Sequence, residues 1–298
     1  MTRFLLLSVS VLAGLLPGAA VRAGAADTLL PGLPAAMAPH DIPRAVDSAA
    51  SAHPVPNLTA AQIIDRNVAA RGGLEAWRKV QTMMLAGHIE TARGSQTTLP
   101  FVLEIARPNK THFEIDVRNQ RSVRVYDGRE GWKMRAVQSS PPELQPFSPQ
   151  ELRYASDAQV VDGVLIDHEA KGISVVAEGI DQLDGRVAYR LSAHLPSGAL
   201  ETVWVDAETF LEVRSQREFH NQANLTGRTT MYYSDFRDVD GLKLPFLVET
   251  ASGTGQTPDK LIIEKVSLNL PFDERTFSRP HTSRVRETRP QNAAAGAR

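Results

Sequence analysis

The residues of this chain that could carry chemistry are scattered rather than grouped. Its eight histidines form no His-x-His pair and no pair four residues apart, the spacings that zinc sites use. His168-Glu169 begins like a metalloprotease motif, but Gly172 stands where the second histidine would be. We therefore predict no metal site and no cofactor.

Nucleophilic catalysis lacks its usual residues as well. The chain has no cysteine and no Gly-x-Ser-x-Gly elbow. Asp235, Asp238 and Asp240 form close acidic pairs, which suit general acid and base work, but they flank the turn dipeptide Asp240-Gly241. We interpret them as turn formers and predict that the protein is not an enzyme. A hydrolase with an unrecognised carboxylate site at Asp235 is the least favoured alternative.

The first 26 residues have the order of a secretory signal peptide. Arg3 gives a positive start, Phe4 to Leu16 are mostly apolar, and small residues follow, with cleavage expected after Ala25 or Ala26. The apolar stretch is shorter than the roughly 20 residues that span a bilayer. We expect an exported protein with no stable membrane span in its mature chain, and the missing cysteine excludes a lipid anchor at the cleavage point.

Charge gives little information about partners. The chain has 33 basic and 34 acidic residues, and loss of Arg3 and Arg22 with the signal leaves 31 against 34. A net charge near −3 forces no basic face, so we predict no nucleic-acid partner.

Two helix starts lie at the beginning and in the middle of the strand-rich part of the chain. Thr59 with Gln62, and Ser148 with Glu151, each form a capping box, so helices are predicted from Ala60 to about Arg71 and from Pro149 to near Ser156. A further short helix is expected over 163–171. Residues 27–57 read as a flexible leader and 281–298 as a disordered tail, which leaves 58–280 as one ordered domain.

Four Asp-Gly dipeptides punctuate the strands: Asp127-Gly128, Asp162-Gly163, Asp184-Gly185 and Asp240-Gly241. An Asp-Gly dipeptide between two runs of alternating apolar and polar residues is a strong hairpin signal. Asp162-Gly163 is the exception, because it lies among the helices predicted in the middle of the chain. The fold class is α+β, mostly β. We predict one large curved antiparallel sheet of about ten or eleven strands, an unclosed β-barrel, with helices over its concave side.

Apolar and aromatic residues of the predicted strands define a candidate wall for a hydrophobic ligand. A curved sheet that does not close leaves more apolar surface than short helices cover. Ordinary core packing explains the same residues, and both interpretations stay open. The candidates are Leu85, Phe101, Leu103, Phe113, Ile115, Val123, Val125, Trp132, Tyr189, Leu191 and Trp204.

Five motifs in order give the chain a family resemblance. They are "LTAAQIIDRNVAARGGLEAWRKVQTMMLAG", "VRVYDGREGWKM", "LDGRVAYRLSAHLPSGALETVWVDAETFLEVR", "YSDFRDVDGLKLPFLVET" and "LNLPFDERTF". Trp204, Asp206 and Thr209 match the positions of a "WxDxxT" pattern. In these motifs the chain resembles the LolA/LolB-like superfamily of periplasmic lipoprotein-sorting proteins.

The resemblance implies a periplasmic, non-enzymatic protein whose unclosed barrel holds an acyl chain. The expected function is a soluble carrier or binder of lipoprotein acyl chains or other hydrophobic ligands. The expected partners are an acylated ligand, such as a lipoprotein, and an envelope protein. The alternative is a periplasmic interaction or envelope-assembly module whose apolar interior is only core.

Overall fold

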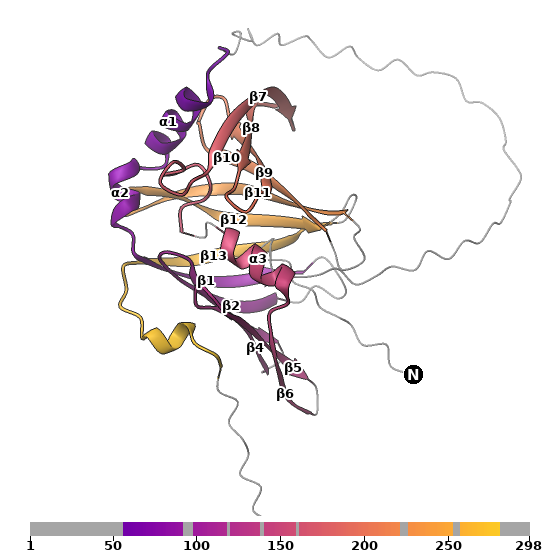
Figure 1. Ribbon diagram of the computed structural model, residues 1–298. Coiled ribbons are helices and arrows are strands. Elements are labelled where there is room, and N and C mark those ends of the chain that lie inside the picture. Colours follow the sequence, from indigo (N-terminus) through magenta and orange to yellow (C-terminus); the bar gives the residue numbers. More distant parts are fainter. Residues whose placement is uncertain are drawn as a thin grey trace, which may run out of the picture.

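The chain folds around one large antiparallel sheet. A computed structural model describes residues 56–91, 98–117, 120–137, 140–158, 161–220, 226–252 and 257–280. In this part of the chain, thirteen strands form a single open sheet that runs from β7 at the top of Figure 1 to β6 at the bottom. The predicted signal peptide, most of the predicted leader and the predicted tail lie outside the described residues.

Every neighbouring pair of strands in the sheet is antiparallel. The strands are β1 Thr82–Glu90, β2 Thr98–Ala106, β3 Lys110–Val117, β4 Gln120–Tyr126, β5 Gly131–Val137, β6 Ser140–Pro146, β7 Ser174–Leu183, β8 Arg186–His194, β9 Leu200–Asp206, β10 Glu212–His220, β11 Thr226–Val239, β12 Leu242–Ser252 and β13 Asp259–Leu268.

The strand order explains where the helical insertion must run. The order is β6-β5-β4-β3-β2-β1-β13-β12-β11-β10-β9-β8-β7, so the first and last strands pair in the middle. The chain leaves the middle, reaches one edge at β6, and resumes at the other edge with β7. The connection over residues 147–173 therefore crosses from one edge of the sheet to the other.

Local sequence signals set the helices. Thr59 and Gln62 form both halves of a capping box at the start of α1 (Ala60–Ala70), and Ser148 and Glu151 do the same for α3 (Pro149–Asp157). A second short helix, α2 (Leu74–Lys79), follows α1, and the 3-10 turn η1 (Glu274–Phe277) closes the described chain. Both predicted capping boxes are confirmed.

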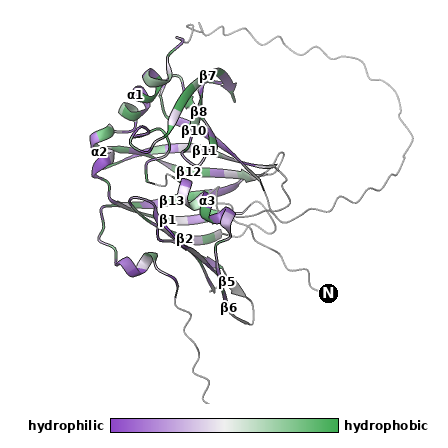
Figure 2. Cartoon of the chain, in the orientation of Figure 1, coloured by the Kyte–Doolittle hydropathy of each residue, from purple (hydrophilic) through white to green (hydrophobic). Residues whose placement is uncertain are grey.

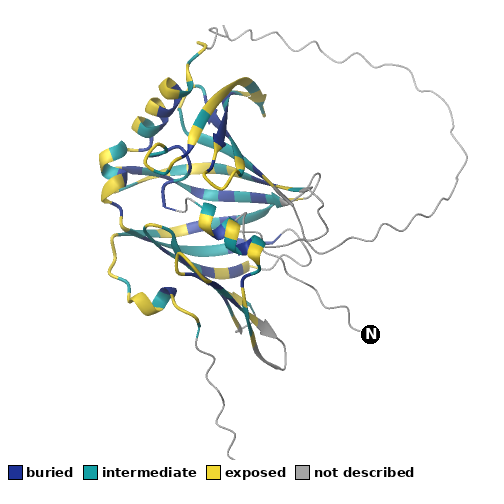
Figure 3. Ribbon diagram, viewed as in Figure 1, coloured by how far each residue is buried: buried dark blue, intermediate teal, exposed yellow. Residues whose placement is uncertain are grey.

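The two faces of the sheet have different covers. We call the face packed against α1, α2, α3 and residues 161–172 the inner face, and the opposite face the outer face. Along α1 the hydrophobic residues lie on one side, where Ile63 and Ile64 pack against β8 and β9, and its other side is exposed (Figures 2 and 3). On the outer face, Phe277 of η1 packs against Val123 and Val125 of β4.

Helix α3 shows that the inner face is strongly curved. Its Glu151 pairs with Lys133 of β5, while the ring of Tyr154, one turn later, lies 5.9 Å from the guanidinium carbon of Arg217 on β10. In a flat sheet, strands eight places apart would be separated by about 38 Å. One turn advances a helix by only about 5 Å. The sheet must therefore curl until β5 and β10 face the same short helix.

The predicted class, one large open antiparallel sheet with few helices, is confirmed, although the described sheet has thirteen strands rather than ten or eleven. Three Asp-Gly dipeptides join paired strands, and at Asp184-Gly185 and Asp240-Gly241 both residues have positive φ, as a primed turn requires. The helix expected over 163–171 is wrong. Residues 161–172 form consecutive turns, and Gly163 and Asp167 have positive φ, which an α-helix cannot contain.

Candidate ligand-binding face

Seven of the eleven candidate wall residues lie on the inner face. Strand pairing aligns Leu85 with Leu103, Leu103 with Phe113, and Phe101 with Ile115, so these five share one surface. Tyr189 and Leu191 lie on the same face of β8, opposite Val205 and Val203 of β9.

The other four candidates lie on the outer face, so they cannot belong to the same wall. Val123 and Val125 pair with Glu114 and His112, which point away from Phe113, and Trp132 pairs with Val125. Trp204 pairs with Arg190 and Arg214 and donates its indole N–H to Asp181 at 2.8 Å. Alternation shows which residues share a face, but packing neighbours decide which face is covered, and here η1 covers Val123 and Val125.

The seven inner residues divide between two apolar clusters. Phe101, Leu103 and Phe113 belong to the larger cluster over β1–β3 and β11–β13, with Leu85 and Ile115 at its border. Tyr189 and Leu191 belong to a cluster over β8 and β9 beneath α1. The fully buried members are core in this structure, so a ligand reaches them only when part of the cover moves.

Residues 161–172 plug the space between the two clusters. Val161 and Ile166 pack into the larger cluster, and Val164 and Leu165 into the smaller one. All four are at least 94% buried. The plug is therefore held in place by apolar contacts on both sides.

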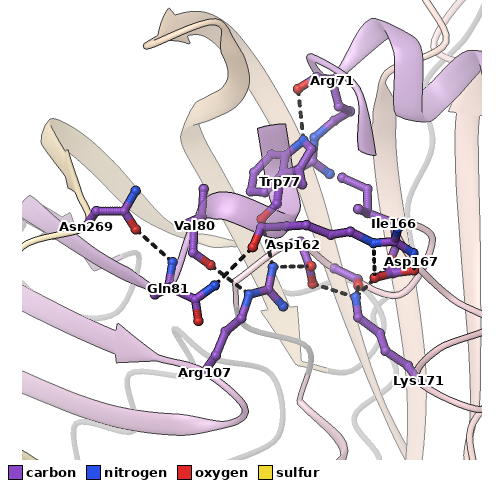
Figure 4. Close-up of polar contacts among 12 residues, drawn as sticks. Arg71, Trp77, Val80, Gln81, Arg107, Asp162, Ile166, Asp167, Lys171 and Asn269 are labelled. Atoms are coloured by element: carbon purple, nitrogen blue, oxygen red, sulfur yellow. Dashed lines mark hydrogen bonds and ion pairs between the residues drawn. The ribbon is translucent and has the colours of Figure 1, made fainter. Parts of the chain in front are cut away.

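Ion pairs tie the plug to α2 and to Arg107, the residue that follows β2 (Figure 4). Asp162 accepts from Arg107 at 2.7 Å and from Lys171, whose ammonium also donates to the Ile166 carbonyl at 2.7 Å. Arg78 of α2 donates two bonds to Asp167, at 2.9 and 2.7 Å. Burial lowers the pKa of Lys171, although Asp162 opposes that change.

Helix α3 is held to the sheet mainly by charge. The carboxylate of Glu151, 1% exposed, accepts two bonds from the Lys133 ammonium, at 2.9 and 2.8 Å, and one from Arg124 at 3.0 Å. The helix also has a small apolar anchor, because Ala155 is buried in the cluster of Tyr126 and Phe147 and Leu152 packs against it. The Asn109 amide donates to the carbonyls of Ala155 and Ser156 at its last turn, both at 2.8 Å.

The same contacts set the protonation of Glu151. Burial raises the pKa of its carboxyl, but the bond from Lys133, the backbone N–H of Ser148 and the charge of Arg124 together outweigh burial and lower it. The capping carboxylate is therefore also the ionised anchor that ties α3 to β4 and β5.

A polar band crosses the inner face between the two apolar clusters. On β9, β10 and β11 it contains Glu201, Ser215, Arg217 and Tyr233, and the Ser215 and Tyr233 hydroxyls lie 2.9 Å apart. Burial raises the pKa of both Glu201 and Tyr233. The inner face is thus apolar at both sides and polar where the end of α3 lies over β10.

An open cleft of about 680 Å³ lies elsewhere, at the junction of α1 and α2 with the β11–β12 hairpin. Its lining includes Gly72, Leu74, Lys79, Asp240 and Leu242, and none of the eleven candidate wall residues. The cleft therefore borders the larger apolar cluster, to which Leu242 and Val80 belong, at a place away from the candidate wall residues.

The residues considered for catalysis occupy structural positions. Asp235 pairs with the exposed Arg237 at 2.6 Å, which lowers its pKa, and Asp238 accepts the Gly241 backbone N–H at 3.0 Å. His112 contacts Glu104 at 2.7 Å. Within the described ranges, no three or more His, Cys, Asp or Glu residues are grouped to hold a metal ion, and no helix has the length and apolarity to cross a membrane.

Sequence reasoning missed the inward-facing cations Arg124, Lys133 and Arg217. Each lies in an alternating run, where a charged residue is normally assigned to the wet face. In β4 the signal was present, because Arg124 lies opposite Phe113 once β3 and β4 are paired. The register of β3 with β4 is needed to infer that Arg124 lies on the inner face, and the sequence does not supply that register.

The curved sheet and its helical cover define the class as an open antiparallel sheet with a covered concave face. The structure is similar to that of a LolA superfamily protein from Nitrosomonas europaea, at 12% identity and a TM-score of 0.48, covering 74% of this chain and 98% of the other. It is also similar to a DUF1329 family protein from Desulfovibrio piger, at 13% identity and a TM-score of 0.48, covering 73% of this chain and 96% of the other.

The lipoprotein LppX of Mycobacterium tuberculosis gives 11% identity and a TM-score of 0.26, covering 72% of this chain and 98% of the other. These neighbours include the superfamily that the sequence motifs resemble, and at such identities the likeness concerns the fold alone. No protein-family model matches the sequence, and none of the curated proteins does.

Proposed function

We propose that this protein is a non-catalytic, exported binder of hydrophobic or acylated ligands, whose apolar part lies on the inner face once α3 moves. One observation carries the proposal: α3, which bridges β5 and β10 across the concave face, is anchored by a buried carboxylate rather than by an apolar stripe. A charge-held helix over an apolar surface is a cover that can be released without dismantling the core.

Burial supplies the binding energy in this proposal. Each acyl CH₂ removed from water contributes about 0.8 kcal/mol, so ten carbons contribute about 8 kcal/mol before the costs of association. Phe101, Phe113 and Ile115 offer the apolar surface on the β2–β3 side. The protein acts in the periplasm, after removal of residues 1–26, and its ligand is a lipid or a lipoprotein acyl chain.

The test is direct. Protein purified from the native compartment is extracted with organic solvent and the extract is analysed by mass spectrometry, while delipidated protein is titrated with the neutral fluorophore N-phenylnaphthylamine. We expect a co-purified lipid and saturable binding that weakens in Phe113→Asp. An extract without lipid, together with no saturable binding, contradicts the proposal.

An interaction module is the second candidate, and the edge strand β7 favours it. β7 pairs only with β8 in the described sheet, and its Val176 and Ile180 are 48% and 42% exposed. An exposed apolar edge is a surface on which a partner strand can add. In that case a protein co-purifies stably, Val176→Lys abolishes its binding, and Tyr189→Asp unfolds the domain instead of changing ligand affinity.

A further inference from the structure

Arg217 of β10 is a buried cation with unsatisfied donors. The residue is 8% exposed, and within the described part of the chain its Nε and Nη2 have no hydrogen-bond acceptor. The nearest paired carboxylate oxygen, on Glu201, is 3.7 Å from Nε, beyond hydrogen-bond distance. Because buried N–H donors without acceptors are costly, the position of these two donors on the inner face points to an anion that binds there.

The groups around Arg217 suit an anion better than a structural ion pair. Burial raises the pKa of the Glu201 carboxyl, although the charge of Arg217 and a hydrogen bond with Ser215 oppose that change, and the carboxylate oxygen stays 3.7 Å from Nε of Arg217. The Ser215 and Tyr233 hydroxyls lie on the same face, on β10 and β11. Asp157 of α3, the other nearby carboxylate, accepts a bond from the Ser197 hydroxyl at 2.9 Å.

Helix α3 brings a second cation to the same region. Glu151 and Tyr154 are three residues apart and so share one face of α3. Glu151 contacts Arg124 and Tyr154 contacts Arg217. The Nε of Arg124 also has no acceptor among the described residues. Two guanidinium groups with spare donors thus lie beneath one turn of α3, beside the apolar surface of the β2–β3 side.

We infer that Arg217, assisted by Arg124, binds the anionic headgroup of an amphiphile, a carboxylate or a phosphate, whose apolar chain lies on the inner face. This inference rests on the proposed function and adds the polar half of the ligand. The planar fork of arginine donates two parallel bonds to either anion, which fixes the headgroup under α3 and directs the chain along the sheet.

Three ligands with the same dodecyl chain test the inference by displacement of N-phenylnaphthylamine from delipidated protein: dodecanoate, dodecyl phosphate and the neutral dodecanol. We expect both anions to bind at least roughly tenfold more tightly than dodecanol. Arg217→Gln is expected to remove that difference and to leave dodecanol binding unchanged. The tighter anion identifies the source as a fatty carboxylate or a phospholipid phosphate.

The matched control is Arg214→Gln. Arg214 lies on the same strand, its Nε also has no acceptor among the described residues, and its guanidinium stacks on Trp204 at 4.4 Å on the outer face. Arg214→Gln is expected to leave the affinities for dodecanoate, dodecyl phosphate and dodecanol unchanged. A second variant, Arg217→Lys, keeps the positive charge but loses the planar fork of the guanidinium. We expect it to lose part of the preference for the two anions over dodecanol, and circular dichroism checks that both Arg217 variants fold.

The outcomes separate this inference from the proposed function. Equal affinity of wild-type protein for dodecanoate, dodecyl phosphate and dodecanol overturns the headgroup site and leaves the apolar binder intact, as does an Arg214→Gln effect equal to that of Arg217→Gln. Failure of N-phenylnaphthylamine and of all three dodecyl compounds to bind overturns both.

Discussion

Two neighbouring parts of the cover over the inner face, α3 and the plug, are held by different forces. The plug, residues 161–172, buries Val161, Val164, Leu165 and Ile166 between two apolar clusters. Helix α3 instead depends on the buried Glu151 and its two cations. The two segments are adjacent in sequence. Because their anchors differ, we expect α3 to open while the plug stays with the core.

The largest effect is expected at the plug. Leu165 is fully buried, and Leu165→Ala is expected to lower the free energy of unfolding by about 3 kcal/mol, through lost burial and the cavity left behind. Urea denaturation measures the change. The control Leu200→Ala removes a leucine that is 45% exposed and should cost about 0.5 kcal/mol or less. Equal effects of the two substitutions would show that the plug is not core.

The next effect is local to α3. Glu151→Gln keeps an acceptor for the Ser148 backbone N–H but loses the charge that pairs with Lys133 and Arg124, at a cost of about 2 kcal/mol. Since 1.4 kcal/mol is a factor of ten, α3 amides should exchange hydrogen roughly 30 times faster.

Amides of the plug should keep their exchange rates in Glu151→Gln, and mass spectrometry of exchanged peptides reports both segments. Glu75→Gln, on the exposed side of α2, is the control and should change neither segment. Faster exchange in the plug and in α3 alike would mean that the two segments open together.

Acid should release α3 through the same carboxylate. The pKa of Glu151 is lowered in the folded protein from its ordinary value of 4.5, so its stabilisation of α3 is complete above that pH and is lost as pH falls through the lowered value. Because the chain has no cysteine, Arg153→Cys places one label on the exposed side of α3.

Fluorescence anisotropy of that label should fall below pH 4.5 before the tryptophan signal of global unfolding changes. In the Glu151→Gln background this early transition should be missing. A transition that persists there would assign the acid response to another group.

The smallest effect is expected at the cap of α3. Ser148→Ala removes the acceptor for the Glu151 backbone N–H, worth about 1 kcal/mol, and should speed α3 exchange about fivefold. Thr59→Ala makes the same change at α1, whose Ile63 and Ile64 are anchored in a core cluster. In α1 the lost stability should appear as a lower free energy of global unfolding. If Thr59→Ala and Ser148→Ala speed local amide exchange equally in their own helices, α3 is not held differently from the rest of the cover.

Local features of the fold were predictable because their causes are local. Thr59 with Gln62 and Ser148 with Glu151 satisfy helix ends within four residues, and Asp184-Gly185 and Asp240-Gly241 supply the positive φ of tight turns. The candidate wall was predicted in part. Phe101, Leu103 and Phe113 share the inner face, but Val123, Val125, Trp132 and Trp204 lie on the outer one.

The sequence by itself determined the class of the fold, a large open antiparallel sheet with capped helices, because alternation, turns and caps act between near neighbours. Only the tertiary structure decided which face of each strand is covered, since that choice depends on pairing between strands far apart in the chain. It also turned Glu151 from a capping residue into the anchor of α3, and Arg217 from a surface charge into a buried cation. Both depend on the curl that brings β5 and β10 to the same helix.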